Sequence, residues 1–325
     1  MTTLKPRLVF SEHYDIRLFG MEKLHPFDSC KYGRVWDELK SIFGNQLEGI
    51  THSVDREVSR EELLLVHTHD YLHELESSIY IARALELPFV SAIPAMVLDS
   101  KILKSMRYAV RGTILAAQEA LTHGIGVNLA GGYHHASRGR GEGFCIYADI
   151  PIAIAELHRT KELSPEDKIL ILDLDAHQGN GIERICNQLS FQNVFIFDVY
   201  NEDIYPGDTE AKKRINFNFP IQTNTADGVY TGIVMEYLPR VLKELGNVKL
   251  VFYNAGTDIF EHDPLGQLKV TENGVLSRDT FVFNTLMTAN LPFVMVLSGG
   301  YTKQSYHLVS RSLRYLLERS GMEPK

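Results

Sequence analysis

The stretch KILILDLDAHQGNG, residues 168–181, decides the fold of this chain. A short apolar run ends in Asp173, Asp175 and His177, and a Gly-Asn-Gly sequence closes it. An apolar run of this length without polar alternation is typical of a strand that is buried on both faces, as in a parallel sheet. The polar residues at its end predict a site at the carboxyl edge of that sheet, where open parallel sheets bind their ligands.

Apolar runs that end in glycine or polar residues recur along the chain. Four more segments follow this pattern: GIGVNLAGGYHHA (124–136), NVFIFDVYN (193–201), VKLVFYNAGTD (248–258) and LPFVMVLSGGY (291–301). Helical patterns separate them, and strands that alternate with helices indicate a three-layer α/β/α fold with a central, mainly parallel sheet. Because no repeat or linker divides the 325 residues, we expect one domain over residues 1–325.

Three segments between the apolar runs carry helix signals. Ser59 and Glu62 form a capping-box signature ahead of LLLVHTHDYLHEL. The segments 33–43 and 226–245 each place apolar residues on one helical stripe, and Gly246 marks the end of the second. The stripes consist of Val35, Trp36, Leu39, Ile42 and Phe43 in the first segment, and of Val229, Tyr230, Ile233, Val234, Tyr237, Leu238, Val241 and Leu242 in the second.

Composition excludes several classes of protein. The net charge of −8 and the absence of a Lys/Arg run disfavour direct nucleic-acid binding. The three cysteines, Cys30, Cys145 and Cys186, show no paired spacing, which fits a reducing compartment. No secretory signal pattern and no run of ~18 apolar residues is present. We expect a cytoplasmic protein, or a nuclear one if the source is eukaryotic, that is not secreted; the sequence does not indicate an oligomeric state.

The pattern Asp173-x-Asp175-x-His177 predicts a metal site. Alternate positions of a strand point to one face, so the three side chains are expected to converge. Clustered carboxylates near a core are costly, and a cation offsets that cost. Two carboxylates and an imidazole suit Zn²⁺, with Fe²⁺ or Mn²⁺ as alternatives. Asp258 ends another apolar run and is the expected ligand from a second strand, and a three-ligand site leaves a position open for water or substrate.

Tandem histidines follow the Gly-Gly of GGYHHA, residues 131–136. Glycines allow the backbone to turn both His134 and His135 toward one cleft. A general base needs a pKa near neutrality and a partner that fixes its tautomer. Asp173 is the candidate partner for one histidine and Asn180 for the other.

Tyr301 ends the glycine-containing sequence LSGGY. Its hydroxyl is suited to donate to an oxyanion that develops on a metal-bound carbonyl. A metal, two histidines and this donor together predict a hydrolase that attacks an amide or ester with water. No G-x-S-x-G motif offers a competing serine nucleophile, and the cysteines lack catalytic surroundings.

Five motifs carry a family resemblance, and along the chain they are GGYHHA, GEGFCIYADIPIAI, DLDAHQGNG, YNAGTDIFEHDPLG and LSGGY. Together they resemble the zinc-dependent histone deacetylase family of the arginase/deacetylase fold, from about residue 7 to about residue 315. HPFDSCKYGRVW, DAHQGN and DVYNEDIYPGD are similar to the class IV branch. The resemblance implies a zinc-dependent lysine deacetylase or deacylase that acts on acyl-lysine in proteins or peptides.

The resemblance implies two metal sites. The zinc ligands that it implies are the same as those expected from the residues alone, namely Asp175, His177 and Asp258, with Fe²⁺ as the alternative metal in the cell. It also implies a structural monovalent cation, usually K⁺, behind the zinc. That cation would be held partly by the backbone carbonyls of Asp173 and of the two ligands that follow it, near Asp198.

The resemblance also implies catalytic and substrate-binding roles. His134 pairs with Asp173, and His135 is the principal general base and acid. Tyr301 stabilises the tetrahedral oxyanion. The tunnel for the acyl-lysine chain is lined by Gly143, Phe144, Tyr205 and Leu265. Class IV resemblance further implies that long-chain fatty acyl groups are removed as readily as acetyl, or more readily.

The chain departs from the common family pattern at three places. Asn180 stands where many members carry Asp, and because a neutral amide stabilises an imidazolium less, we expect a lower pKa for His135 than Asp would give. Tyr133 stands where Phe or Leu is commoner. The loop PFVSAIPAM (88–96) lacks the acidic residue that grips the substrate backbone in better-known classes, so selectivity for peptide sequence is not implied.

Three alternatives differ in the residues they require. Arginase-like hydrolases need an Asp in the form DAHxD, where this chain has Gly179. Acetylpolyamine deacetylases share the zinc site, and some carry a Glu near the DP-x-G turn. Here Leu265 occupies that turn, and an apolar wall favours an aliphatic acyl-lysine over a second ammonium group. A non-catalytic reader would lack site residues, and none is missing.

Overall fold

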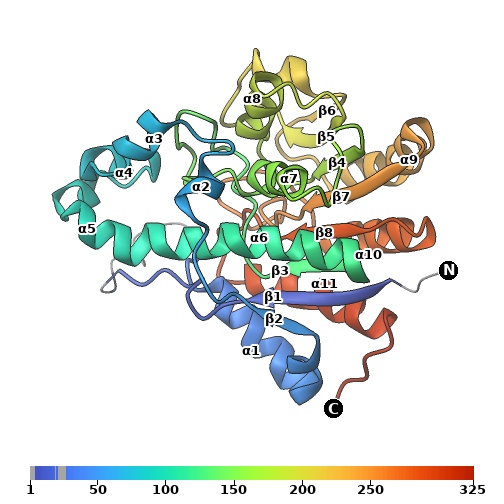
Figure 1. The fold of residues 1–325 in the computed structure, drawn as a ribbon. Helices are drawn as coiled ribbons and strands as arrows, with labels where there is room; N and C mark the ends of the chain where they lie inside the picture. Colours follow the sequence, from blue (N-terminus) through green and yellow to red (C-terminus); the bar gives the residue numbers. More distant parts are fainter. Residues whose placement is uncertain (1–3, 19, 21–26) are drawn as a thin grey trace.

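The computed structural model describes residues 4–18, 20 and 27–325. The first two residues of the motif HPFDSCKYGRVW lie outside these ranges. Eight strands form one sheet in the order β2-β1-β3-β8-β7-β4-β5-β6, and all neighbouring strands are parallel. Helices cover both faces of the sheet (Figure 1). The structure therefore confirms the layered α/β fold with a parallel central sheet.

The strands are β1 (Lys5–Phe10), β2 (Thr51–Ser53), β3 (Gly124–Asn128), β4 (Lys168–Asp173), β5 (Val194–Asn201), β6 (Phe217–Ile221), β7 (Val248–Asn254) and β8 (Phe293–Val296). The five predicted runs form β3, β8, β7, β4 and β5, which are contiguous in the middle of the sheet. Their residues are almost all buried, so they read as continuous apolar runs. The outer strands β6 and β2 were not predicted, because β6 alternates between partly buried and exposed positions and β2 is mostly exposed.

The α-helices are α1 (Lys31–Phe43), α2 (Arg60–Leu63), α3 (His69–Glu74), α4 (Ser78–Ala84), α5 (Ala95–Leu98), α6 (Lys104–His123), α7 (Asp149–Arg159), α8 (Asn180–Gln188), α9 (Asp227–Leu245), α10 (Glu272–Thr288) and α11 (Ser305–Arg319). Short 3₁₀ or π turns are η2 (Gly44–Gln46), η3 (Glu48–Ile50), η4 (Pro88–Ala92), η5 (Asp99–Leu103) and η6 (Ala211–Arg214). Helices α6 and α7 pack together, while α1, α11, α10 and α9 form a second set of neighbours. Among the described residues, no helix has the length and apolar character needed to cross a membrane.

The predicted helix signals are confirmed with two corrections. The Ser59 hydroxyl accepts from the Glu62 N–H, and the Glu62 carboxylate accepts from the Ser59 N–H, which completes the capping box. The run after it forms two helices instead of one, because Thr68 caps α3 through its side chain and starts a new helix. Helix α9 ends at Gly246 as expected. Val229, which the stripe places among the buried residues, is 59 % exposed, because the first turn of α9 buries its neighbour Tyr230 instead.

The loops that follow four neighbouring strands meet at the carboxyl edge of the sheet. Backbone hydrogen bonds continue the sheet pattern beyond the strands: the N–H of Leu174 donates to the carbonyl of Asn254 (3.0 Å), and that of Ala255 to the carbonyl of Val296 (3.0 Å). The fully buried Arg278 of α10 adds a clamp, because its guanidinium donates to the carbonyls of Leu174 (3.0 Å) and Gly256 (2.6 Å). The loops after β4 and β7 are thereby fixed relative to each other.

Candidate active site

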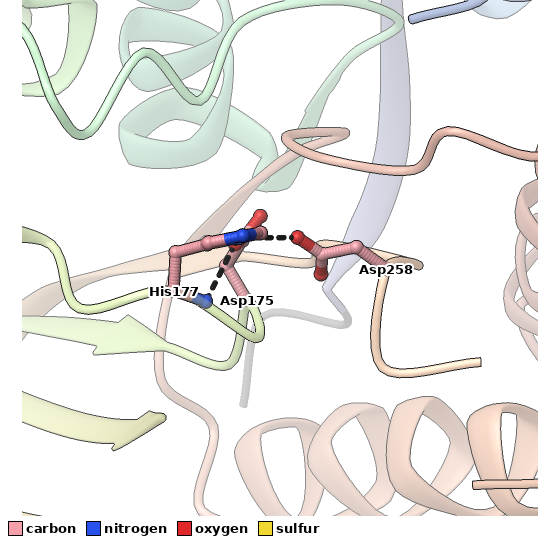
Figure 2. A group of neighbouring side chains, drawn as sticks. All are labelled: Asp175, His177 and Asp258. Carbon is pink, nitrogen blue, oxygen red and sulfur yellow. Dashed lines mark hydrogen bonds and ion pairs between the residues drawn. The ribbon is translucent and has the colours of Figure 1, made fainter. Parts of the chain in front are cut away.

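Asp175 and His177 from the loop after β4 meet Asp258 from the loop after β7 (Figure 2). The Nδ1 atom of His177 lies 2.9 Å from Oδ2 of Asp258 and 3.1 Å from Oδ1 of Asp175. One ligand atom from each of the three buried residues lies within 4.8 Å of the others. The expected strand alternation was wrong here, because β4 ends at Asp173 and the next residues turn. Asp173 points elsewhere and pairs with His134.

Backbone groups hold the two carboxylates in place. The N–H of Ala176 donates to Oδ1 of Asp258 (2.9 Å), and the N–H of Gly299 donates to Oδ2 of Asp175 (2.9 Å). Glycine is required at Gly299 because a Cβ atom there would lie 2.5 Å from Oδ2 of Asp258. At Gly256 a Cβ atom would lie 2.3 Å from Oδ2 of Asp175. The glycines of YNAGTD and LSGGY therefore let the backbone approach the carboxylates closely.

The charges at this cluster fit a divalent cation. Burial, together with the charge of Asp175, raises the pKa of Asp258 to about 7. Burial opposes the charged form of His177, but hydrogen bonds to Asp175 and Asp258 outweigh it and raise its pKa to about 10. Two buried carboxylates this close disfavour each other's ionised form, and a bound cation removes that conflict. Two oxygen donors and one nitrogen donor fit zinc and leave a coordination position open.

Both histidines have the predicted partners. Nδ1 of His134 lies 3.0 Å from Oδ2 of Asp173, and Nδ1 of His135 lies 2.8 Å from Oδ1 of Asn180. The two ring centroids are 4.1 Å apart. A proton on Nδ1 of His135 satisfies the acceptor of Asn180 and leaves the lone pair on Nε2.

The surroundings of the two histidines push their pKa values apart. Burial opposes the charged form of His134, but the charges of Asp173 and Asp175 outweigh it and raise its pKa to about 9. Burial, and then the positive charges of His134 and His177, lower the pKa of His135 well below its ordinary value. Paired groups of this kind are suited to separate acid and base roles.

Tyr301 completes the group of predicted catalytic side chains. Its ring centroid lies 6.2 Å from that of His177 and 5.9 Å from that of Phe144. Burial, followed by the charges of Asp175 and Asp258, raises the pKa of Tyr301 well above its ordinary value. Its hydroxyl therefore stays protonated and able to donate a hydrogen bond.

Two cavities meet at this group. The outer cavity has a volume of about 1020 Å³, its opening to solvent included, and all four predicted tunnel residues line it: Gly143, Phe144, Tyr205 and Leu265. Gly143 has a φ of +54°, and a Cβ atom there would lie 2.5 Å from Cδ2 of His135. The inner pocket measures about 860 Å³, its open part included, and is mostly apolar. His135, Gly143, Phe144 and Tyr301 line both cavities.

Two buried acids support the site and were not singled out from the sequence. Asp149 accepts hydrogen bonds from the N–H groups of Gly132 (2.9 Å) and Tyr133 (2.8 Å) and so fixes the turn before the histidines. Asp263 accepts from the N–H of Tyr301 (2.7 Å) and holds that residue beside the cavity. Both acids lie inside motifs that were noted, IYADI and EHDPLG, and that placement was the available signal.

A buried lysine was also missed. Lys31 of α1 is fully buried, and its Nζ donates to the carbonyls of Ser298 (2.5 Å) and Gly299 (3.1 Å). Burial lowers its pKa to about 8, against the opposing charges of Asp258 and Asp175. A lysine is expected at the surface, so the residue type alone gave no indication of burial. Its position in the motif HPFDSCKYG was the only sequence signal.

Asp198 lies beside Asp173 on the neighbouring strands β5 and β4. Its Oδ2 accepts from the N–H of Gly179 (3.0 Å), whereas Oδ1 has no hydrogen-bond partner within the described part of the chain. Burial, and then the charge of Asp173, raise the pKa of Asp198 well above its ordinary value. A free buried oxygen is compatible with a cation, and the monovalent site stays a prediction.

Comparison with known proteins identifies the family. The family described as "Histone deacetylase domain" matches residues 25–317. The chain belongs to the histone deacetylase family. This deacetylase is accordingly a zinc-type hydrolase that cleaves amide bonds. The family predicted from the five motifs is confirmed.

The relatives of the deacetylase span most of its length. Histone deacetylase 2 of Arabidopsis thaliana is 40% identical over 319 residues, which cover 98% of this chain and 80% of that protein. The acetoin utilization protein AcuC of Bacillus subtilis is 27% identical over 337 residues, which cover 97% of this chain and 82% of that protein. The crystal structure of the HDA15 HD domain matches with a TM-score of 0.71 at 20% identity, covering 99% of this chain and 91% of that one. That structure shares the fold, and the class IV assignment stays a prediction.

Proposed function

We propose that this deacetylase hydrolyses the Nε-acyl amide bond of lysine in proteins or peptides, at the site formed by Asp175, His177 and Asp258 with His135 and Tyr301. The observation that carries the proposal is that a zinc-type ligand set, a paired imidazole and a tyrosine hydroxyl meet where two cavities join. When bound, zinc supplies an activated water and polarises the substrate carbonyl.

The protein groups divide the proton transfers between them. His135 keeps a proton on Nδ1 toward Asn180, so Nε2 takes the proton of the attacking water and later gives it to the departing lysine amine. His134, paired with Asp173, supplies positive charge next to the reacting atoms. The Tyr301 hydroxyl donates to the carbonyl oxygen as that oxygen becomes negative.

We propose a preference for long acyl chains on the basis of the inner pocket. The lysine stem would occupy the outer cavity, and the acyl chain would extend past the shared residues into the inner pocket. Apolar side chains there include Ile16, Leu18, Leu85, Leu87, Ile102 and Met106. Burying an aliphatic chain against such side chains contributes about 0.8 kcal/mol per methylene group.

A second candidate, deacetylation of small polyamines, rests on two carboxylates. Glu86 and Asp203 line the outer cavity. They are suited to a second ammonium group of a polyamine, whereas Leu265 on the same cavity favours an aliphatic chain. The two candidate substrates would therefore use the same reacting groups but different side chains of the outer cavity.

A substrate series separates these functions. Lysine peptides that bear acetyl through myristoyl groups, together with acetylated polyamines, are assayed with the zinc-loaded protein for kcat/KM. We expect kcat/KM on peptides to rise with chain length. Activity confined to acetyl-lysine would contradict the long-chain preference, and activity confined to polyamines would contradict the protein substrate.

Narrowing the inner pocket is expected to reverse the preference. The change Leu87→Trp adds bulk to a half-buried wall residue and should lower kcat/KM for the myristoyl peptide about tenfold, with acetyl turnover nearly unchanged. Leu291→Trp, at a half-buried position in a separate surface groove, is the matched control and should alter neither substrate. Equal losses on both substrates in Leu87→Trp would show that the acyl chain does not enter this pocket.

A further inference from the structure

Asn180 joins the catalytic imidazole to a carboxylate. Its Oδ1 accepts from Nδ1 of His135 (2.8 Å), and its Nδ2 donates to Oε1 of Glu142 (2.9 Å). Asn180 is buried at the start of α8, while Glu142 precedes the tunnel residue Gly143 in the loop before α7. The side-chain amide of Asn180 accepts through Oδ1 and donates through Nδ2. A partner that fixes which of these two atoms faces it therefore also fixes which atom faces the other partner.

The imidazole alone would not fix this choice. Neutral His135 pairs equally well with a flipped Asn180 amide, but its proton would then sit on Nε2, and Nε2 could not accept a proton from water. An ionised carboxylate only accepts hydrogen bonds, so Glu142 selects the orientation with Nδ2 toward itself. We propose that Glu142 is a positioning residue that sets the Asn180 amide and, through it, the His135 tautomer that is competent for catalysis.

Glu142 is itself held by two arginines. Nη1 of Arg184 lies 2.5 Å from its Oε1, and Nη2 of Arg140 lies 2.7 Å from its Oε2. Arg184 also forms an ion pair with Asp208. The Glu142 side chain is only 20% exposed, so these contacts restrict its rotamer as well as balance its charge. The chain His135–Asn180–Glu142–Arg184 is thus continuous.

This arrangement accounts for the amide at position 180. An Asp there would present an oxygen to Oε1 of Glu142 in place of an N–H donor, which would bring two carboxylates into direct contact. Asn180 and Glu142 are therefore matched, and the tolerance for Asp at position 180 is expected to depend on the residue at position 142. The inference rests on the proposed function, because it assigns a task to the proposed base.

The experiment combines kinetics with NMR on zinc-loaded protein. Glu142→Ala is expected to lower kcat on an acetyl-lysine peptide about tenfold with KM within about twofold of wild type. Nitrogen NMR of isotopically labelled histidine rings should show His135 as the Nδ1–H tautomer in wild type and as a mixture of tautomers in Glu142→Ala. Glu57→Ala is the matched control, because Glu57 also pairs with an arginine, Arg107 (2.6 Å), and should change neither readout.

A double-mutant cycle tests the matching directly. Asn180→Asp should lower kcat at least about tenfold when Glu142 is present, and clearly less when combined with Glu142→Gln, whose amide can donate to the new carboxylate. Additive effects in this cycle, or an unchanged kcat and an unchanged His135 tautomer in Glu142→Ala, would overturn the proposal. If wild type hydrolyses no acyl-lysine, the proposed function fails, while the tautomer measurement still decides the role of Glu142.

Discussion

Asp258→Asn is expected to abolish stable zinc binding and to reduce deacylation by about a thousandfold or more, because a three-ligand site loses one charged ligand. The variant keeps an oxygen that can accept from the N–H of Ala176, so the local backbone should stay in place. Zinc content after dialysis should fall from about one ion per chain in wild type to a small fraction of that in the variant.

Thermal unfolding provides a readout that is independent of activity. Zinc should raise the Tm of wild type, because it binds only the folded state, and should not raise that of Asp258→Asn. Without zinc the variant should be at least as stable as wild type, because burial and Asp175 disfavour the charged form of Asp258. Asp167→Asn, in the turn before β4, serves as the control. Full zinc content in Asp258→Asn would refute the assigned ligand.

Tyr301→Phe is expected to lower kcat by about 100- to 1000-fold, because the oxyanion loses a hydrogen-bond donor in a buried site. The pKa of Tyr301 is raised well above its ordinary value by burial and by the charges of Asp175 and Asp258, so the hydroxyl donates throughout the neutral pH range. KM and zinc content should change little, since the ring and its backbone contact with Asp263 remain.

A matched tyrosine separates this effect from general damage. Tyr306→Phe on α11 removes a hydroxyl from a ring that packs against Arg34 outside both cavities, and its kcat should equal that of wild type. If Tyr301→Phe kept full kcat on every acyl peptide, the donor to the oxyanion would have to be another group.

The sequence predicted those strands whose burial leaves a pattern in their own residues. The five central strands are buried on both faces, so each is a continuous apolar run, whereas β6 has a half-exposed, alternating pattern that resembles many loops. The zinc ligands could be proposed because carboxylates directly after such runs are costly unless a cation or partner compensates them. The change from strand to turn after Asp173 was not visible in that pattern.

The supporting residues could not be predicted because their partners are distant in the chain. Lys31 contacts the carbonyl of Ser298, 267 residues away, and apart from its place in the motif HPFDSCKYG no local pattern indicates a buried lysine. The role of Glu142 was equally hard to predict, since its contact with Asn180 spans 38 residues and depends on how the loop before α7 packs against the start of α8. Such long-range side-chain hydrogen bonds follow from the tertiary structure, and the local periodicity of the sequence does not predict them.

The clamp made by Arg278 has a consequence for how this enzyme can diversify. Its guanidinium fixes the loops that carry the ligands, and it comes from α10, whereas the outer cavity is shaped by residues such as Gly143, Phe144 and Tyr205 on other loops. Arg278 itself lines neither cavity, so the side chain that fixes the ligand loops is distinct from most of those that shape the substrate space, although the ligands His177 and Asp175 also line the two cavities. Substitutions at cavity residues that hold no metal, such as Tyr205 or Leu87, can therefore change acyl specificity while the clamped loops keep the metal centre in place.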